Sequence, residues 1–320
     1  MNKEELLKQI EEAKNQIARL QNDIDKMQNA VDIIKGDGMM SNFIKTPMNY
    51  VGGKYKLLPQ IIPLFPDKIN TFVDLFCGGF NVGINVNAKT IIGNDMCKEV
   101  IEVYQGIQQE GVERSLNLVK SEINKYGLSK ANEEGYKAIR DYYNEGHKDW
   151  YVFYAMLTHS FNYQIRFNKQ GKYNMPFGRN RSCFNNTLEK HFIKFGNAIE
   201  NKNIIFTNNS FEVFKVDKLK ENDFVYLDPP YLITCASYNE QNGWDENKEL
   251  SLLNLCDSIN EKGVKFALSN VLEHKGYENN ILKEWAKKYK INYLNYNYNN
   301  CNYQNNNKEN KTTEVLITNY

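Results

Sequence analysis

The segment DFVYLDPPYLIT, residues 223–234, joins a carboxylate, two prolines and an aromatic residue directly after an apolar run. Residues 224–227 predict a buried strand, and prolines cannot continue a central strand, so the chain must leave the sheet at Asp228. An exocyclic amine on a nucleobase is a poor nucleophile because its lone pair is delocalised into the ring. A carboxylate and a backbone carbonyl that accept its two protons would pull the nitrogen towards tetrahedral geometry, and prolines would keep both acceptors in place.

We therefore predict that this corner acts on an extruded base, with the aromatic ring stacking on the base face. The predicted catalytic residues are Asp228, Pro229, Pro230 and Tyr231. The alternative for an isolated D-P-P is a helix-capping Asp in an ordinary turn. The occurrence of all four residues at a strand end favours chemistry over that alternative.

Two glycine-rich turns and one acid have the types and positions expected of a nucleotide site. In DLFCGG, residues 74–79, glycines follow an apolar strand, where they let a ligand approach the backbone. In NYVGGKYKLL, residues 49–58, two glycines precede Lys54, although the motif is too short for a P-loop. Asp95 ends the next predicted strand, where nucleotide-binding α/β folds place an acid for ribose hydroxyls. Tight turns and a helix cap remain the structural alternatives.

The segment HSFNYQIRFNKQGKYNMPFGRNRSCFNN, residues 159–186, is basic and aromatic. No Asp or Glu occurs from Trp150 through Leu188, and NKQGK predicts a hairpin turn. Arginine reads guanine and Asn or Gln reads adenine, so such a hairpin suits the phosphates and base edges of DNA. The alternative is a solvated basic loop with a packed aromatic base.

The elements that must position these residues alternate between strand and helix. Residues 71–87 predict a strand, a glycine turn and a short helix, and residues 203–211 predict a strand followed by a loop. Further strands are predicted at 90–96, 224–227, 264–270, 291–296 and 313–319, with helices at 246–262 and 277–289. This alternation predicts an α/β fold with a largely parallel sheet covered on both faces. Residues 106–200 lack the alternation and predict an inserted helical region, preceded by helical patterns from about 97.

Composition limits the function classes. The 320 residues carry a formal net charge of +1, so local charge must decide the partners. Six scattered cysteines without a C-x-x-C pair argue against a zinc site and a disulfide framework, and suit a reducing cytoplasm. No run reaches the roughly 18 apolar residues of a membrane span. We therefore expect no metal and no membrane partner.

Residues 3–35 form a separate unit. Their apolar positions alternate steps of four and three for about four heptads, the pattern of a coiled coil. We predict a coiled-coil helix over 1–35, self-association through residues 3–35, and a linker over 36–42. Packing of this helix on its own globular domain, or on an outside partner, are the alternatives.

The ordered motifs YVGGKY, DLFCGG, ND, the basic insert and DPPY resemble the Dam family of DNA adenine methyltransferases, the D12 or alpha-group amino-methyltransferases. The resemblance covers about residues 43–320 and is nearest to the Dam enzymes of T-even phages, in segments such as IRFNKQGKYNMPFG and TTEVLI. It implies a Rossmann-like class I methyltransferase sheet, with a catalytic domain at 43–105 and 201–320. It also implies a target-recognition insert at 106–200, whose DNA-reading hairpin spans about 161–181.

The resemblance implies an adenine-specific DNA methyltransferase that uses S-adenosylmethionine on double-stranded DNA, at GATC or a related short site. The cofactor residues it implies are Tyr50, Gly52, Lys54, Phe76, Cys77, Gly78, Gly79, Asp95, Phe211, Asp228 and Tyr238. Those expected to bind DNA are Phe161, Asn162, Gln164, Arg166, Lys172, Pro176, Phe177, Arg179 and Arg181. The expected location is the cytoplasm of a bacterial or phage-infected host cell.

Two other functions stay open. An amino-methyltransferase acting on cytosine N4 would keep the fold, but such enzymes more often carry Ser in place of Asp228. A catalytically silent DNA-binding scaffold, assembled through the coiled coil, would not need Asp228 and both prolines intact. A nicotinamide dehydrogenase fits the sheet but lacks G-x-G-x-x-G and leaves the basic hairpin without a role.

Overall fold

The protein is described from a computed structural model, which defines residues 42–234, 243–295 and 312–320. The chain divides into two compact units, residues 1–43 and 44–320. The expected coiled coil over 3–35, nearly all of the expected linker, and Tyr238 lie outside the described residues.

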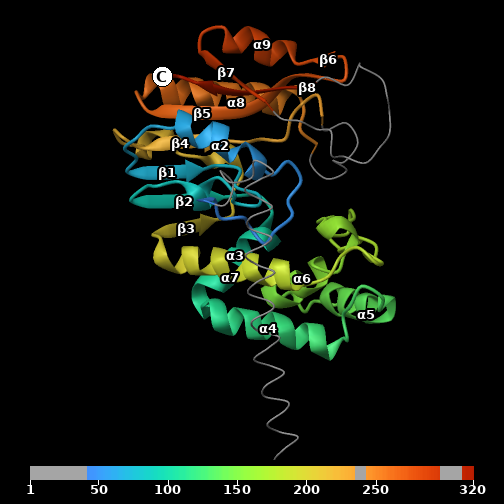
Figure 1. Ribbon diagram of the computed structural model, residues 1–320. Coiled ribbons are helices and arrows are strands. Elements are labelled where there is room, and N and C mark those ends of the chain that lie inside the picture. The colour runs from blue at the N-terminus through green and yellow to red at the C-terminus, as the bar shows by residue number, and fades with distance from the viewer. Residues whose placement is uncertain (1–41, 235–242, 296–311) are drawn as a thin grey trace, which may run out of the picture. The chain divides into compact units, whose positions relative to one another are not determined.

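A single sheet organises this unit, and its strands appear in Figure 1 as a stack of arrows. The strands are β1 (Thr71–Asp74), β2 (Thr90–Asn94), β3 (Ile204–Thr207), β4 (Phe224–Leu227), β5 (Lys265–His274), β6 (Tyr277–Glu278), β7 (Lys290–Leu294) and β8 (Thr312–Thr318). Their order is β3-β2-β1-β4-β5-β8-β7, with the short β6 paired to β5. The first five strands of that order run parallel, and β8 lies antiparallel between β5 and β7. The mixed, mostly parallel α/β sheet expected from the sequence is confirmed.

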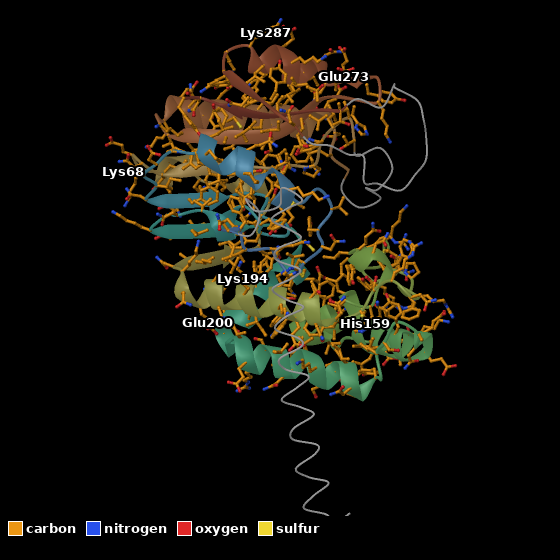
Figure 2. The ribbon with its side chains drawn as sticks, in the orientation of Figure 1. Lys68, His159, Lys194, Glu200, Glu273 and Lys287 are labelled. Carbon is orange, nitrogen blue, oxygen red and sulfur yellow. The ribbon has the colours of Figure 1, made fainter. Side chains whose placement is uncertain are left out.

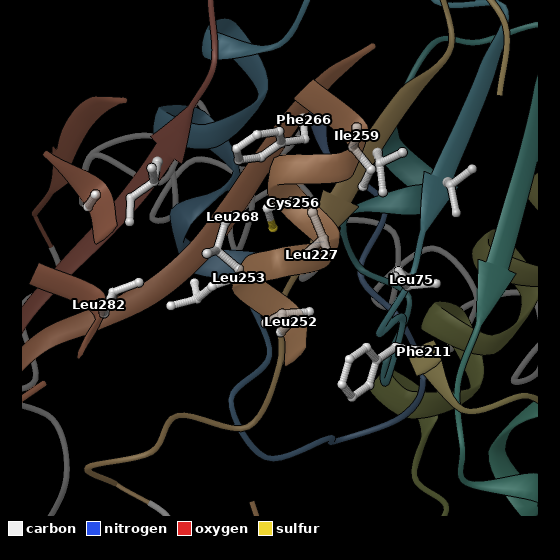
Figure 3. Close-up of a cluster of buried hydrophobic side chains, with 14 of the residues drawn as sticks. Leu75, Phe211, Leu227, Leu252, Leu253, Cys256, Ile259, Phe266, Leu268 and Leu282 are labelled. Atoms are coloured by element: carbon white, nitrogen blue, oxygen red, sulfur yellow. The ribbon is translucent and has the colours of Figure 1, made fainter. Parts of the chain in front are cut away.

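The central strands show that both faces of the sheet are covered. Successive side chains of a strand point to opposite faces, yet all four residues of β4 are buried. On one face, helix α8 (Glu246–Glu261) packs its apolar side chains against β5. Figure 3 shows this cluster, in which Leu252 and Cys256 of α8 lie with Leu227 of β4 and Leu268 of β5. Such burial explains why β4 is an uninterrupted apolar run rather than an alternating one.

The helical part follows β2 along the chain. It comprises α3 (Lys98–Glu110), α4 (Val112–Lys125), α5 (Glu133–Asn144), α6 (Trp150–Leu157) and α7 (Asn186–Asn201). In Figure 1 these green and yellow helices gather beside β3. Gly111 separates α3 from α4 with a φ of 76°, a conformation that glycine adopts at little cost. Residues 158–185, between α6 and α7, are mostly irregular and contain the predicted hairpin.

Two expected helices differ from the structure. The helix expected at 277–289 is shorter, because Tyr277 and Glu278 pair with β5 as β6, and α9 spans only Asn280–Ala286. Gly276, with a φ of 82°, makes the turn that lets the chain reverse. After the DLFCGG turn, the expected short helix is a single 3-10 turn, η4 (Gly83–Asn85). The remaining short helical elements of the described residues are η2 (Tyr55–Leu57), α2 (Leu58–Ile61), η3 (Ile62–Leu64), η5 (Phe161–Tyr163), η6 (Phe211–Val213) and η7 (Val216–Lys218).

The position of Phe224 in the core yields a stability test. Its ring centroid lies 4.8 Å from that of Phe65 and 5.8 Å from that of Phe72, and the residue is 1% exposed. Replacing it with Ala leaves a cavity, so we expect Phe224→Ala to lower the free energy of unfolding by about 3–5 kcal/mol. Guanidinium denaturation measures this. Tyr293→Ala, at a residue 66% exposed, is the control and should stay within about 0.5 kcal/mol of wild type.

Candidate active site

The carboxyl ends of three neighbouring parallel strands bring three acids to one edge of the sheet. Asp74 ends β1, Asp95 follows β2, and Asp228 follows β4. The register pairs Asp74 with Gly93 on one side and with Tyr226 on the other. Ligands of open α/β sheets bind at this edge, where loops leave the strands. The fold therefore places the sequence-predicted catalytic corner beside the predicted nucleotide turns.

Lys54 connects these loops through its ammonium group. Its Nζ lies 3.0 Å from Asp228 Oδ1 and 3.6 Å from Glu314 Oε1, and it donates to the carbonyl of Gly52 at 2.8 Å. The hydroxyl of Tyr231 donates to Asp228 Oδ1 at 2.9 Å and lies 3.4 Å from Glu314 Oε1. The Lys54 side chain is 4% exposed and that of Glu314 is 5% exposed. Two carboxylates thus share one buried ammonium and one hydroxyl; we call these four residues the Lys54 cluster.

The electrostatics of Asp228 follow from this arrangement. Burial raises the pKa of its carboxyl, because a charge inside the protein loses its hydration. The ammonium and hydrogen bond of Lys54 act in the opposite direction and favour the ionised form. The same cluster places the Tyr231 ring 5.0 Å from the Lys54 ammonium. Burial also raises the pKa of the Tyr231 hydroxyl, which keeps it a hydrogen-bond donor.

The DLFCGG turn lies against the ring of Tyr50. Gly78 has a φ of 42°, and a Cβ there would lie 2.8 Å from Tyr50 Cδ1. The turn is held by Asp95 Oδ2, which accepts from the Gly78 amide at 2.8 Å, and by the Tyr104 hydroxyl, which donates to the Gly78 carbonyl at 2.7 Å. A side chain at Gly78 would displace either the ring or the backbone, so glycine is required there.

A pocket opens between this turn and the Lys54 cluster. It has a volume of about 380 Å³, part of it open to solvent. The predicted residues that line it are Tyr50, Gly52, Lys54, Phe76, Cys77, Gly78, Gly79 and Asp228. Gly52, with a φ of 79°, turns the chain at its mouth. The structure thus brings most of the predicted cofactor residues together around one pocket, while Asp95 supports its floor through Gly78.

Phe211 lies in an aromatic group beside this pocket. Its ring centroid is 5.4 Å from that of Phe76 and 5.5 Å from that of Trp244, and the last two rings are 5.9 Å apart. The indole nitrogen of Trp244 donates to the buried carboxylate of Glu249 at 2.6 Å. Trp244 was not predicted as a site residue. It lies beyond the DPPY loop in a stretch with no pattern that could have selected it.

Two acids of the site were also not predicted as functional residues. Asp74 is 1% exposed; its Oδ2 accepts from the Gly83 amide at 3.1 Å, whereas its Oδ1 has no hydrogen-bond partner among the described residues. Burial, and then the charge of Asp228, raises the pKa of Asp74 well above its usual range. Glu314 lies in β8, where it is the single acid in the apolar strand TTEVLIT. An isolated acid inside a buried strand is the signal that could have identified it.

The basic hairpin forms where NKQGK predicted it. Phe167 pairs with Tyr173, the Asn168 amide donates to the Lys172 carbonyl at 2.9 Å, and Gly171 has a φ of 72° at the turn. At the base, the Phe161 amide donates to the Pro176 carbonyl, and Ser160 pairs with Phe177. Figure 2 shows the adjoining His159 within the helical part, where its side chain is buried. The predicted hairpin is confirmed.

The charged side chains of the hairpin are partly engaged within the protein. Arg166 donates from Nε to the side-chain oxygen of Asn174 at 2.8 Å and from Nη2 to its carbonyl at 2.9 Å. Arg179 forms an ion pair with Glu133 of α5, and the guanidinium of Arg181 lies 5.3 Å from the Phe161 ring centroid. The fold thus orients these cations before any ligand arrives.

One contact links the hairpin to the pocket. The side-chain amide of Asn49, next to Tyr50, donates to the Asn162 carbonyl at 3.0 Å. Asn162 and Tyr163 have φ values of 53° and 56°, an uncommon left-handed conformation for residues other than glycine. The predicted DNA-binding residues are therefore a second group, separate from the pocket residues and connected to them through Asn49.

Over 42–234, 243–295 and 312–320, no three His, Cys, Asp or Glu side chains are grouped as a metal site would need. Within the same ranges, no helix is both long enough and apolar enough to span a bilayer. The described cysteines Cys77, Cys97, Cys183 and Cys256 are free thiols.

A family model for D12 class N6 adenine-specific DNA methyltransferases matches residues 50–300. The chain is 50% identical over 289 residues to the type II methyltransferase M.FokI of Planomicrobium okeanokoites, covering 89% of this chain and 44% of that protein. It is 46% identical to the modification methylase StsI of Streptococcus sanguinis, over 87% of this chain and 43% of that protein. It is 24% identical to a DNA adenine methylase of Salmonella typhi, over 77% of this chain and 85% of that protein.

The chain therefore spans less than half the length of the first two relatives. The stretches matched to these two relatives cover 289 and 284 residues. The expected nearness to the phage enzymes stays a prediction. Glu314 lies beyond the residues that the family model matches.

The raised pKa of Asp74 predicts a pH-dependent effect of removing its charge. An acid that keeps its proton to higher pH in the folded state makes unfolding easier as the pH rises from about 4 towards its folded pKa. Asp74→Asn lacks this term, so its stability relative to wild type should increase between pH 5 and pH 8. Urea denaturation at both pH values measures the difference. The exposed Asp67→Asn is the control, and an equal change in both variants would contradict the assignment.

Proposed function

Because the chain belongs to the D12 class of N6 adenine-specific DNA methyltransferases, we propose that it methylates the N6 amine of an adenine extruded from duplex DNA. The observation that carries this proposal is the Lys54 cluster, in which the DPPY carboxylate is 16% exposed, paired with a buried ammonium and part of the glycine-turn pocket. A carboxylate that can accept a proton from an amine lies beside a pocket suited to a nucleotide, at the same edge of the sheet. This arrangement fits methyl transfer better than it fits DNA binding without catalysis.

S-adenosylmethionine would supply the methyl group, carried on a positively charged sulfur. The pocket fits this molecule in its chemistry. Its glycine turns offer backbone to a polar chain, and the unpaired Oδ1 of Asp74 offers a buried acceptor for an ammonium. We propose that Tyr50, Gly52, Lys54 and the turn Phe76–Gly79 hold the methionine part. Asp95 would bind the ribose hydroxyls and Phe211 would stack on the adenine.

Tyr238 is proposed for the same site by resemblance, although it lies outside the described residues. The aromatic group extends the proposal to Trp244, which contacts Phe211 directly. A flat ring packed against two others provides stacking area for a purine at little cost in side-chain entropy.

The catalytic step would depend on Asp228 and the carbonyl of Pro229. Asp228 Oδ1 already accepts from Lys54 and Tyr231, so we propose that its other oxygen accepts one proton of the target amine. The Pro229 carbonyl would accept the second, and the Pro229–Pro230 corner would fix both acceptors. The amine lone pair would then be directed at the methyl group, and the base would stack on the Tyr231 ring. Acceptors fixed before the reaction lower its barrier because they need not reorganise.

DNA would be bound by the basic hairpin within an insert spanning residues 106–200, while 43–105 and 201–320 form the catalytic domain. We propose that Asn162, Gln164, Arg166, Arg179 and Arg181 approach bases and phosphates, with Lys172 at a phosphate. Phe161, Pro176 and Phe177 would shape the hairpin base. The target would be GATC or a related short site. Self-association through residues 3–35 and a cytoplasmic location stay predictions.

The first functional test removes the catalytic carboxylate. We expect Asp228→Ala to abolish methyl transfer, by at least about 1,000-fold, because the amine loses its fixed acceptor. Mass spectrometry of nucleosides from methylated duplex DNA measures the product as N6-methyladenine. Binding of S-adenosylmethionine should persist, since the rest of the pocket is intact.

Asp217→Ala, at an exposed acid preceding β4, is the matched control and should retain full activity. Detection of N4-methylcytosine would replace the proposal with the cytosine alternative. Wild-type protein that binds DNA without any methyl transfer would favour the scaffold.

The second functional test separates base contacts from phosphate contacts in the hairpin. Arg166→Ala should relax discrimination between cognate and altered sites by about 1–3 kcal/mol, because a base contact is lost. Lys172→Ala should instead weaken binding equally on all sequences and reduce the salt slope by about 1. Fluorescence anisotropy with both duplexes across a salt series measures both effects. Equal discrimination by wild type and Arg166→Ala would contradict a reading role for Arg166.

A further inference from the structure

Glu314 is the member of the Lys54 cluster with no assigned role. It reaches the site from β8, 86 residues after Asp228, and its side chain is 5% exposed. Its Oε1 lies 3.6 Å from Lys54 Nζ and 3.4 Å from the Tyr231 hydroxyl, the same two groups that contact Asp228. A buried acid is costly to keep ionised, so its presence beside the reacting corner calls for a function.

The charges of the cluster do not cancel. Lys54 contributes one positive charge, while Asp228 and Glu314 contribute two negative charges when ionised. Asp74, at the neighbouring strand end, adds little, because burial and Asp228 raise its pKa well above the usual range. Without Glu314, the ammonium would neutralise Asp228 alone. With Glu314, and counted over these four residues alone, the ionised groups carry a surplus of one negative charge.

This surplus matters because methyl transfer changes the charge of the donor. The carbon–sulfur bond breaks with its electron pair remaining on sulfur, so the sulfonium becomes a neutral thioether. The amine nitrogen forms the new carbon–nitrogen bond with its lone pair and releases one proton to the Asp228 side of the site. An anionic pocket therefore attracts the donor before transfer more strongly than the product after it.

We infer that Glu314 is a positioning residue that shares the Lys54 ammonium with Asp228, so that Asp228 is less fully neutralised and the site selects the sulfonium over the thioether. This inference rests on the proposed function. Glu314 acts through Lys54 and Tyr231 and need not touch either substrate. It raises the affinity for the donor relative to the spent product, and it strengthens Asp228 as an acceptor for the amine.

The experiment measures two affinities, with no turnover. Isothermal calorimetry of the full chain gives the dissociation constants of S-adenosylmethionine and S-adenosylhomocysteine, which differ in the methyl group and its charge. We expect Glu314→Gln, which keeps shape but removes charge, to reduce the preference for the sulfonium by roughly tenfold. If Glu314 had a purely structural role, the substitution would weaken the binding of both compounds equally. The ratio of their dissociation constants would then be unchanged.

A double variant keeps the test decisive if the single variant is unstable. Lys54→Met with Glu314→Gln removes one charge of each sign, so the surplus is again one negative charge. We expect this variant to bind both compounds more weakly, because Lys54 is proposed to hold the methionine part that both contain. The ratio of the two dissociation constants should nevertheless return to that of the wild type. A double variant whose ratio stays far below wild type would overturn the charge argument.

The remaining outcomes are separable. A wild type that binds neither compound would overturn the proposed function and this inference with it. A wild type that prefers the sulfonium, with the same ratio in Glu314→Gln, would overturn the inference alone. Leu294→Ala, at the buried β7 residue paired with Glu314, is the matched control for packing and should leave the ratio unchanged.

Discussion

The site depends on one buried ammonium. Asp228 and Glu314 come from strands separated by β5 in the sheet, and each would be expensive to bury as an unpaired charge. Lys54 lies within 3.6 Å of both, and its third neighbour is the carbonyl of Gly52. The glycine turn that precedes Lys54 therefore supports the DPPY corner as well as the pocket. These contacts of Lys54 require that the loop carrying Lys54, the end of β4 and the start of β8 all lie at the same edge of the sheet.

The order of the strands in the sheet explains why these side chains lie close together. β1, β2 and β4 are parallel neighbours, so their carboxyl ends bring Asp74, Asp95 and Asp228 to one edge without long loops. The antiparallel β8 runs the other way, so Glu314 lies near the beginning of its strand rather than the end. The pocket itself is lined by residues at the ends of β1 and β4, namely Asp74, Tyr226 and Asp228, and by the two glycine turns. Rigid strands are better supports for a reacting geometry than loops are.

Much of this could be predicted from the sequence, because the informative features are local. The apolar run Phe224–Leu227, the glycines after β1 and the NKQGK turn each depend on neighbouring residues, and the structure confirms all three as predicted elements. The helix expected over 277–289 was too long because Tyr277 and Glu278 pair with the end of β5 across the turn at Gly276, a short hairpin that the helical pattern did not reveal. Glu314 and Trp244 became site residues only through long-range contacts. The position of β8 beside β5 follows from the strand order of the sheet, and the spacing of residues in the sequence does not reveal that order.

The placement of Glu314 in β8 also has a consequence for biosynthesis. The pocket, the DPPY corner and the hairpin are all encoded before residue 235, yet the second carboxylate emerges from the ribosome some 80 residues later. A nascent chain can therefore form most of the site while Lys54 has only Asp228 as its acidic neighbour. Contacts between residues so far apart in sequence form late in folding, since the intervening loop must close first. The negative surplus of the Lys54 cluster thus belongs to the finished polypeptide, and in a chain truncated before β8 the Lys54 ammonium would neutralise Asp228 alone.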